Sequence, residues 1–553
     1  MASAVRHQPV ASFQSHPERY RHWKLAIDGA IARLGMDIKE ENGLRPEDYE
    51  LKQNSYDLGV DIELADAIER LRFEHPEVRV LVFESLLPKV FCAGANIRML
   101  ASSTHGFKVN FCRYTNETRL SLEDASQHSG LRSLCAANGT AAGGGYELAL
   151  AADRIYLVDD GNAAVSLPEV PLLGVLPGTG GLTRLVDKRK VRRDLADLFC
   201  TKAEGFRARD ALRYGLIDGS FPRSRWEAGV SAAAADLAAQ SPTRASQGVP
   251  LSPVNSQVDG RTRRYRSVEL TLDAEARVAT LTVRAPEALA PASASALRDE
   301  GAESWAIRVF REIDDALLHL RFNHDTVGLV LLRTEGDPDA VLAHDAVVHD
   351  NPGDWFATEI RLLRARVLRR LDNTAKSMFA IVDRGSCFVG SLFELALAAD
   401  RSYMLSDDEA GPTLHPTRAA SGGTYPMGTA ISRLQARFAR EPQRAKDLLE
   451  SEHPMHAEEA LSSGLVTLAP DAIDWDDEIR IAIEERISLS PDALTGMEQN
   501  LRFVGNEGCD TKIFGRLSAW QNWIFQRPNA VGEEGALTLY GHPTRPRFDF
   551  RRT

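Results

Sequence analysis

The amino-acid sequence predicts an α/β protein in which a domain of alternating strands and helices occurs twice and a helical segment follows. Strand-like and helical hydrophobic patterns alternate along the first half, which is typical of a mainly parallel sheet with helices packed outside it. Similar motifs return in the second half, and the residues after about 474 have helical patterns. At 553 residues the chain also exceeds one ordinary hydrophobic core, so more than one domain is expected.

The elements of the first half follow from the spacing of their apolar residues, because alternation predicts strands and spacing of three to four residues predicts helices. The predicted elements are a hairpin over 23–37, a helix over 64–73, a buried strand over 78–83, a short strand over 133–137, a helix that begins at 146 and a strand over 154–158. Strands that alternate with helices indicate βαβ units and therefore parallel pairing.

The second half repeats motifs of the first half at a nearly constant offset. Four pairs of segments carry the repeat: 327–332 with 78–83, 432–434 with 183–185 and 460–466 with 211–217, each 249 residues apart, and 394–401 with 147–154, which are 247 residues apart. A constant offset over four motifs indicates an internal duplication, and its period is the size of a whole domain.

The second copy differs from the first where ligand-binding loops are expected. The glycine run at 143–145 becomes Gly-Ser-Leu at 390–392, and no carboxylate stands in the place of Glu169. We therefore expect a catalytic first copy and a degenerate, structural second copy. The predicted boundaries are a polar tail at 1–18, the catalytic domain at 19–239, a linker rich in Ser, Pro and Gln at 240–266, the second copy at 267–474 and a helical region at 475–553.

Composition and charge exclude several classes of function. The net charge of −12 and the isoelectric point of about 5.7 leave no basic excess for nucleic-acid phosphates. No run of about 18 apolar residues is present for a membrane span, and residues 1–19 hold no apolar signal region. The six cysteines lack metal-type spacing and are too sparse for a disulfide framework, so we expect no metal site and a reducing, cytoplasmic location.

Two glutamates stand beside glycine-rich segments. Glu147 closes the run Ala-Gly-Gly-Gly-Tyr-Glu at 142–147, and Glu169 lies in Leu-Pro-Glu-Val-Pro at 167–171, ahead of a Pro-Gly-x-Gly-Gly loop. Glycines let backbone N–H groups approach a ligand without side-chain obstruction. Two carboxylates next to such an anion-stabilising site form an acid/base pair suited to the enolate chemistry of a thioester.

Three sequence blocks, 90–97 (VFCAGANI), 138–147 (NGTAAGGGYE) and 168–185 (PEVPLLGVLPGTGGLTRL), resemble the enoyl-CoA hydratase/isomerase (crotonase) superfamily. The resemblance covers roughly residues 20 to 230 and implies a crotonase-like spiral of ββα turns that binds an acyl-CoA. It implies an oxyanion hole made of the backbone N–H groups of Ala95 and Gly144, with Glu147 and Glu169 as acid and base. The implied CoA-binding backbone comprises Ala93, Ala95, Asn96 and Ile97.

Several departures from the common members resemble a large ring-cleaving branch of this superfamily. The chain is about twice the usual length, Asn96 replaces the usual acidic residue, and the second copy and helical tail are additional. This resemblance implies cleavage of a benzoyl-CoA ring oxygenated at C2 and C3, as an epoxide or dihydrodiol, with water. The products would be a ring-opened 6-oxohexenoyl-CoA and formate, without O₂, metal or redox cofactor. Cys112 is then a candidate base for a second water.

Other interpretations remain open at this stage. The chain is alternatively a simple enoyl-CoA hydratase or isomerase, or a non-catalytic acyl-CoA-binding scaffold. Cys112 is alternatively a buried free cysteine that only fills space, and the apolar and aromatic residues after Phe503 fit a core or a dimer interface better than a ligand site. Because an attached second copy would occupy the surface that crotonases use for trimers, we expect a homodimer.

Overall fold

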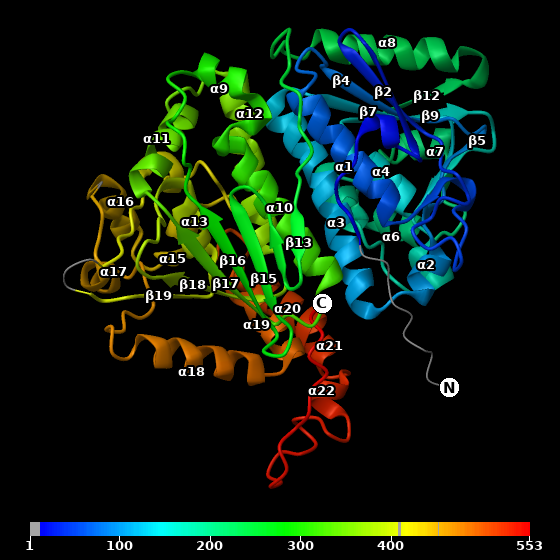
Figure 1. Cartoon of the computed structure of the whole chain (residues 1–553). Coiled ribbons are helices and arrows are strands. Elements are labelled where there is room, and N and C mark those ends of the chain that lie inside the picture. Colours follow the sequence, from blue (N-terminus) through cyan, green and yellow to red (C-terminus); the bar gives the residue numbers. More distant parts are fainter. Residues whose placement is uncertain (1–10, 408–410, 452) are drawn as a thin grey trace. The chain divides into compact units, whose positions relative to one another are not determined.

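The computed structural model describes residues 11–407, 411–451 and 453–553, and the chain divides into two compact units, Met1–Pro253 and Val254–Thr553 (Figure 1). The division falls inside the linker predicted at 240–266. Each unit is an α/β structure built on one large mixed sheet, as the sequence predicts.

The large sheet of the first unit has six strands in the order β1-β2-β4-β7-β9-β12. β1 and β2 form the predicted antiparallel hairpin, and every later neighbour is parallel. The strands are β1 (Trp23–Asp28), β2 (Ile31–Met36), β4 (Val80–Ser85), β7 (Arg132–Ala137), β9 (Arg154–Asp159) and β12 (Gly219–Pro222). The strands predicted at 78–83, 133–137 and 154–158 are therefore confirmed to within two residues at each end.

A second, smaller layer of strands carries the sequence motifs. A four-stranded sheet has the order β11-β10-β8-β5, and a two-stranded sheet pairs β3 with β6. The strands are β3 (Ser55–Tyr56), β5 (Lys89–Cys92), β6 (Gly94–Ala95), β8 (Gly139–Ala142), β10 (Ala164–Ser166) and β11 (Phe206–Arg207). Because β5, β8 and β10 are parallel neighbours, the loops that follow them lie at the same edge of this sheet.

Helices cover both faces of the large sheet of the first unit, with α8 on one face and α1 and α4 on the other (Figure 1). The helices are α1 (Leu58–Phe73), α2 (Ile97–Ser102), α3 (His105–Asp124), α4 (Gly144–Ala151), α5 (Gly181–Thr183), α6 (Arg193–Cys200), α7 (Ala208–Arg213) and α8 (Trp226–Ala239). α1 begins six residues earlier than predicted, because Asp57 caps it by accepting the N–H groups of Gly59 and Val60. α4 begins at Gly144 rather than at 146, because Gly143, with φ 53°, ends the preceding turn.

The large sheet of the second unit has seven strands in the order β13-β14-β15-β16-β17-β18-β19. From β15 onward, strand order and direction repeat β1, β2, β4, β7 and β9 of the first unit. The strands are β13 (Gln257–Asp259), β14 (Thr262–Arg264), β15 (Val268–Asp273), β16 (Val278–Arg284), β17 (Leu329–Glu335), β18 (Ser377–Val382) and β19 (Arg401–Met404). The end of the predicted linker thus forms two strands of this sheet.

The counterpart of the four-stranded sheet in the second unit consists of isolated backbone bridges. These bridges pair residues equivalent to those that pair in the first unit. Leu414 bridges Met455, and subtracting 249 from each number gives Val165 and Phe206, which pair in β10 and β11. The helices before the C-terminal region are α9 (Ala294–Glu300), α10 (Trp305–Asn323), α11 (Pro338–His349), α12 (Trp355–Asp372), α13 (Gly390–Ala398), α14 (Arg418–Ser421), α15 (Arg433–Arg437), α16 (Pro442–Ser451) and α17 (Ala457–Ser463).

The C-terminal region is helical, as predicted, and comprises α18 (Trp475–Ser488), α19 (Pro491–Leu501), α20 (Cys509–Arg516), α21 (Asn522–Ile524) and α22 (Pro528–Val531). α18 begins 249 residues after α8 and packs Trp475 and Ile479 against the sheet residues Leu331 and Phe379. α18 is therefore the counterpart of α8, and we place the end of the second copy after it.

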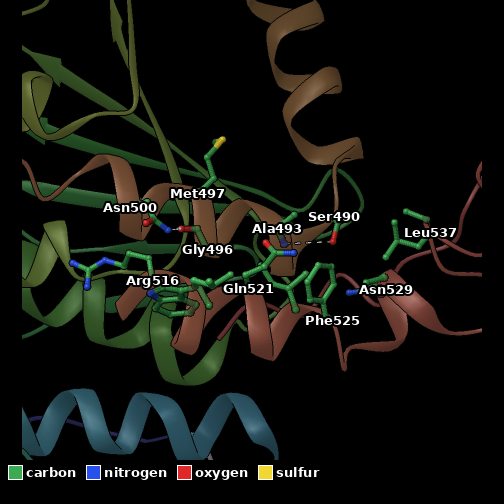
Figure 2. Close-up of a pocket in the computed structure, with 15 residues that line it drawn as sticks. Ser490, Ala493, Gly496, Met497, Asn500, Arg516, Gln521, Phe525, Asn529 and Leu537 are labelled. Carbon is green, nitrogen blue, oxygen red and sulfur yellow. Dashed lines mark hydrogen bonds between the residues drawn. The ribbon is translucent and has the colours of Figure 1, made fainter. Parts of the chain in front are cut away.

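The helices after α18 leave apolar side chains at the surface of the second unit. Phe514 is 65% exposed, and Leu517 and Phe525 are also more than half exposed. A cavity of about 570 Å³ lies among these helices, lined by Met497, Phe525 and other mainly apolar residues (Figure 2). The tail therefore does not close into a core of its own.

Candidate active site

The loop after β5 approaches the start of α4. Gly94 has φ 87°, and a methyl group added to it would lie only 2.8 Å from both the Gly144 nitrogen and the Ala142 carbonyl oxygen. Only glycine permits this close contact between the two loops. Ala95 follows Gly94, so the structure brings together the two residues whose N–H groups were expected to form an oxyanion hole.

The start of α4 is the second wall of the site. Gly144 is the first residue of the helix, and the first N–H groups of a helix have no intrahelical partner and carry its positive dipole end. A methyl group on Gly144 would lie 3.3 Å from the Ala95 nitrogen and 2.2 Å from the Tyr56 hydroxyl oxygen. The backbone of Ala95 and Gly144 and the side chain of Tyr56 therefore surround one small volume.

Glu147 lies in the first turn of α4 and is 2% exposed. Its Oε1 atom accepts hydrogen bonds from the backbone N–H groups of Thr179, at 2.9 Å, and Gly181, at 2.8 Å. The Pro-Gly-x-Gly-Gly loop thus holds the carboxylate in place. A side chain at Gly181 would clash with it, since a methyl group there would lie 2.9 Å from Oε1.

Glu169 begins a single π-helical turn, Glu169–Leu173, directly after Pro168, and is 9% exposed. Its Oε1 atom faces the glycine run, because a methyl group on Gly143 would lie 2.7 Å from it. Its buried Oε2 atom has no hydrogen-bond partner among the described residues. Burial, together with the negative charge of Glu147, raises the pKa of Glu169 to about 7.

The two glutamates therefore have different environments, which is the usual way for one site to hold an acid and a base. Two backbone donors hold one oxygen of Glu147. Glu169 has a buried oxygen without a donor, and at neutral pH a large fraction of this group keeps its proton.

The other predicted residues lie around this pair. Cys112 on α3 points toward the loop after Glu169, because a methyl group on Gly178 would lie 3.0 Å from its Sγ atom. Burial and the charge of Glu147 raise the pKa of Cys112 to about 11, so it is a neutral thiol at pH 7. Ala93 and Ile97, which lie before and after the short strand β6, are exposed.

The Asn96 side chain has a structural role. Its Oδ1 atom caps α2 by accepting the Met99 N–H, and its Nδ2 atom donates to the Glu50 carbonyl oxygen at 2.7 Å. Its backbone N–H donates to the Tyr56 carbonyl oxygen at 2.9 Å and its carbonyl oxygen accepts the Leu100 N–H, so Asn96 has no backbone donor left for a ligand.

Sequence reasoning missed Tyr56, and with it Arg119 and Asp61. Tyr56 forms β3 immediately before the capping residue of α1, and Arg119 lies on α3. Arg119 donates to the Tyr56 hydroxyl oxygen and to Asp61, both at 2.9 Å. A tyrosine before a helix and an arginine within one carry no local signal of a site.

The second unit fills the corresponding space with its own side chains. Gly390 repeats the φ of Gly143, and Ser391 stands in the place of Gly144. The Asp345 carboxylate accepts the Ser391 N–H at 2.6 Å and the Ser391 hydroxyl at 2.9 Å, and it pairs with the buried Arg364. The hole of the second copy is thus occupied by an aspartate of the chain itself.

Glu394, the counterpart of Glu147, also has a structural role, because its carboxylate forms an ion pair inside the core. It is fully buried and pairs with Arg433 at 3.0 Å, and Arg433 also pairs with Asp372. A carboxylate held in a buried ion pair is not available as a base.

Comparison with known proteins identifies the family of this chain. The enoyl-CoA hydratase/isomerase family matches residues 48–277. The benzoyl-CoA-dihydrodiol lyase of Aromatoleum evansii is 52% identical over 554 residues, which cover 99% of this chain and all of that protein. The fatty acid oxidation complex subunit alpha of Aliivibrio fischeri is 30% identical over 204 residues, 36% of this chain and 26% of that protein. An enoyl-CoA hydratase structure from Geobacillus kaustophilus HTA426 is 31% identical, with a TM-score of 0.35 over 40% of this chain and 75% of its own.

The chain therefore belongs to the enoyl-CoA hydratase/isomerase family. Within that family it is similar, from end to end, to benzoyl-CoA-dihydrodiol lyase. The fold class predicted from the sequence is thereby confirmed. In the described ranges, no helix is long and apolar enough to cross a membrane, and no three metal-ligating side chains are grouped together.

Proposed function

We propose that this protein cleaves the ring of a benzoyl-CoA that carries oxygen at C2 and C3, as an epoxide or a dihydrodiol. The ring opens between these carbons, one carbon leaves as formate, and 6-oxohexenoyl-CoA remains. The observation that carries the proposal is the pair of unlike glutamates beside the two backbone donors. The end-to-end similarity to benzoyl-CoA-dihydrodiol lyase supports this substrate over an enoyl-CoA.

In the proposed mechanism, Glu147 accepts a proton from the attacking water or ring hydroxyl, and Glu169 donates a proton to the oxygen that departs from the ring carbon. Electron density that reaches the carbon next to the thioester is stabilised at the carbonyl oxygen by the N–H groups of Ala95 and Gly144. Losing one such donor typically costs about 3 kcal/mol. The backbone of Ala93, Ala95, Asn96 and Ile97 holds the CoA. Ala93 and Asn96 do so through their carbonyl oxygens, because their N–H groups already donate to the Gln53 and Tyr56 carbonyl oxygens.

A second water must remove the one-carbon unit as formate. Cys112 lies beside Gly178, next to the loop that holds Glu147, and its raised pKa makes it a hydrogen-bond donor rather than a base at neutral pH. We assign it to this second hydration, with Glu147 as the base. The whole reaction consumes two waters from the epoxide and one from the dihydrodiol, and acid–base steps alone balance it in both cases, so the proposal requires no metal or redox cofactor.

The test is incubation of purified protein with 2,3-oxygenated benzoyl-CoA, followed by mass spectrometry for the ring-opened thioester and formate. Glu147→Gln and Glu169→Gln should each abolish ring opening. Glu394→Gln, a matched change at the same helix position of the second copy, should leave it unchanged. Full ring cleavage by either active-site variant would contradict the mechanism.

The alternatives give different results in the same preparation. Fast hydration of crotonyl-CoA without ring cleavage would indicate a simple hydratase. Tight binding of acyl-CoA with no turnover of any substrate would indicate a scaffold. The buried charge of Glu147 and the raised pKa of Glu169 argue against a scaffold, because a binding surface alone does not need such groups.

We also propose a cytoplasmic homodimer. All six cysteines are free, which suits a reducing compartment. The exposed apolar residues of the C-terminal helices, among them Leu501, Phe514 and Tyr540, are suited to burial against a second copy. Sedimentation of the wild-type protein and of Phe514→Glu tests this, because a dimer held by these helices should dissociate in the variant.

A further inference from the structure

A chain of buried polar side chains ends at the proposed thioester site. Asp61 on α1 accepts from Arg119 Nη1 and from the Thr118 hydroxyl, at 2.9 and 2.8 Å. The other terminal nitrogen of Arg119, Nη2, donates to the Tyr56 hydroxyl oxygen at 2.9 Å. All three residues of the Asp61–Arg119–Tyr56 chain are at most 3% exposed.

The Tyr56 hydroxyl lies beside both backbone donors of the site. A methyl group added to Gly144 would lie 2.2 Å from this hydroxyl oxygen, which is the atom nearest to it. The Ala95 nitrogen would lie 3.3 Å from the same methyl group. β3, which contains Tyr56, pairs with β6, which contains Ala95, so the sheet fixes the two residues side by side.

The hydrogen bonds determine where the tyrosine proton points. Because Arg119 donates to the hydroxyl oxygen, the proton of Tyr56 must be directed elsewhere, and this hydroxyl donates to no acceptor among the hydrogen bonds of the described residues. Burial keeps the pKa of Tyr56 above its usual range, so the group stays protonated. The result is a fixed donor without a protein acceptor.

The second copy has other residues at the positions of these groups, and its own buried arginine, Arg364, lies one turn earlier on α12 and pairs with Asp345. Adding 249 to the numbers of Tyr56, Asp61 and Arg119 gives Trp305, Phe310 and Leu368, which are all buried apolar residues. The alignment is supported by a shared hydrogen bond, because Tyr20 donates to Asp66 in α1 as Tyr265 donates to Asp315 in α10. A buried ion pair is often no more stabilising than apolar residues of similar size, so packing does not explain its presence in the first copy.

We propose that the Tyr56 hydroxyl is a third hydrogen-bond donor to the thioester oxygen of the substrate, alongside the N–H groups of Ala95 and Gly144. Arg119, held by Asp61, positions the hydroxyl and polarises its O–H bond. Tyr56 donates a hydrogen bond throughout and transfers no proton. This inference rests on the proposed function only in requiring that the ligand is an acyl-CoA.

The test measures the carbonyl stretching frequency of benzoyl-CoA, labelled with ¹³C at its carbonyl group, when bound to the protein. This unreactive ligand reports hydrogen bonding to its oxygen directly. Binding to the wild type should lower the frequency, and Tyr56→Phe should lose part of that decrease while it still binds the ligand. In turnover, Tyr56→Phe should lower kcat about 100-fold with little change in KM, as for the loss of one oxyanion donor.

Arg119→Lys provides a second variant, because lysine keeps the charge but lacks the fork that reaches both Asp61 and Tyr56. An intermediate carbonyl frequency is expected, and this variant decides the question if Tyr56→Phe does not fold. An unchanged frequency in a variant that folds and binds would overturn the third donor. Failure of the wild type to bind benzoyl-CoA would instead overturn the proposed function, so the two failures are distinguishable.

Discussion

Replacing Glu169 by glutamine should make the protein more stable above neutral pH while it abolishes ring cleavage. The fold raises the pKa of this carboxyl from 4.5 to about 7, so the folded state favours the protonated form. The stability associated with the group is therefore fully present below pH 4.5, is lost as the pH rises through about 7, and is absent above that.

The size of the effect follows from the pKa values. Each unit of pKa difference corresponds to about 1.4 kcal/mol, so the ionised Glu169 costs the folded state up to about 3 kcal/mol at pH 8. Water that reaches its exposed edge screens the charge, and we expect about 2 kcal/mol. Glutamine stays neutral and avoids this cost, although its amide group carries a burial cost of its own that does not depend on pH.

The assay must report on the first unit alone, because a chain of two units need not unfold in one step. Hydrogen exchange of the peptides that contain α4 and the Glu169–Leu173 turn meets this need. The quantity to compare is the change in opening free energy between pH 5 and pH 8 for the wild type and Glu169→Gln. An equal change in both proteins, or a wild type that gains stability over this range relative to the variant, would refute the reasoning.

Three further predictions test other parts of the site. Gly144→Ala should lower turnover by about 100-fold or more, because its methyl group would lie 2.2 Å from the Tyr56 hydroxyl oxygen and force the walls of the site apart, whereas Gly353→Ala, which meets nothing within 4 Å, should be neutral in the same assay. Cys112→Ala should slow formate release more than ring opening in stopped-flow kinetics, and Cys112→Ser should restore it, whereas equal effects on both steps would exclude the assigned role. Asp345→Ala should destabilise the second unit by about 3–5 kcal/mol in chemical denaturation, because Ser391 and the buried Arg364 both lose their partner. Added formate or acetate should restore part of that stability, and no effect of either anion would show that the hole had collapsed.

The sequence was informative where chemistry depends on local backbone geometry. The glycines at 94 and 144 and the glutamates at 147 and 169 lie in short motifs whose spacing reflects a loop or a helix start, so their grouping could be predicted. The strand positions could be predicted as well, because buried strands such as β4 are continuously apolar.

Other features depend on packing between distant segments and could not be predicted. Tyr56 and Arg119 are 63 residues apart and meet only because α1 packs on α3. The role of Asp345 depends on a hydrogen bond to Ser391, 46 residues away. The exposure of Phe514 depends on how the C-terminal helices fold, and its apolar character alone suggested burial or an interface equally.

The aspartate in the hole of the second copy behaves as a permanently tethered ligand. A group on the same chain is present at a very high effective concentration. Its binding free energy therefore adds to the stability of the fold, and no molecule from solution is needed to fill the hole. A duplicated domain that acquires such a group can lose its activity without losing its stability. If the first copy binds acyl-CoA as proposed, a titration should therefore saturate at one ligand for each chain.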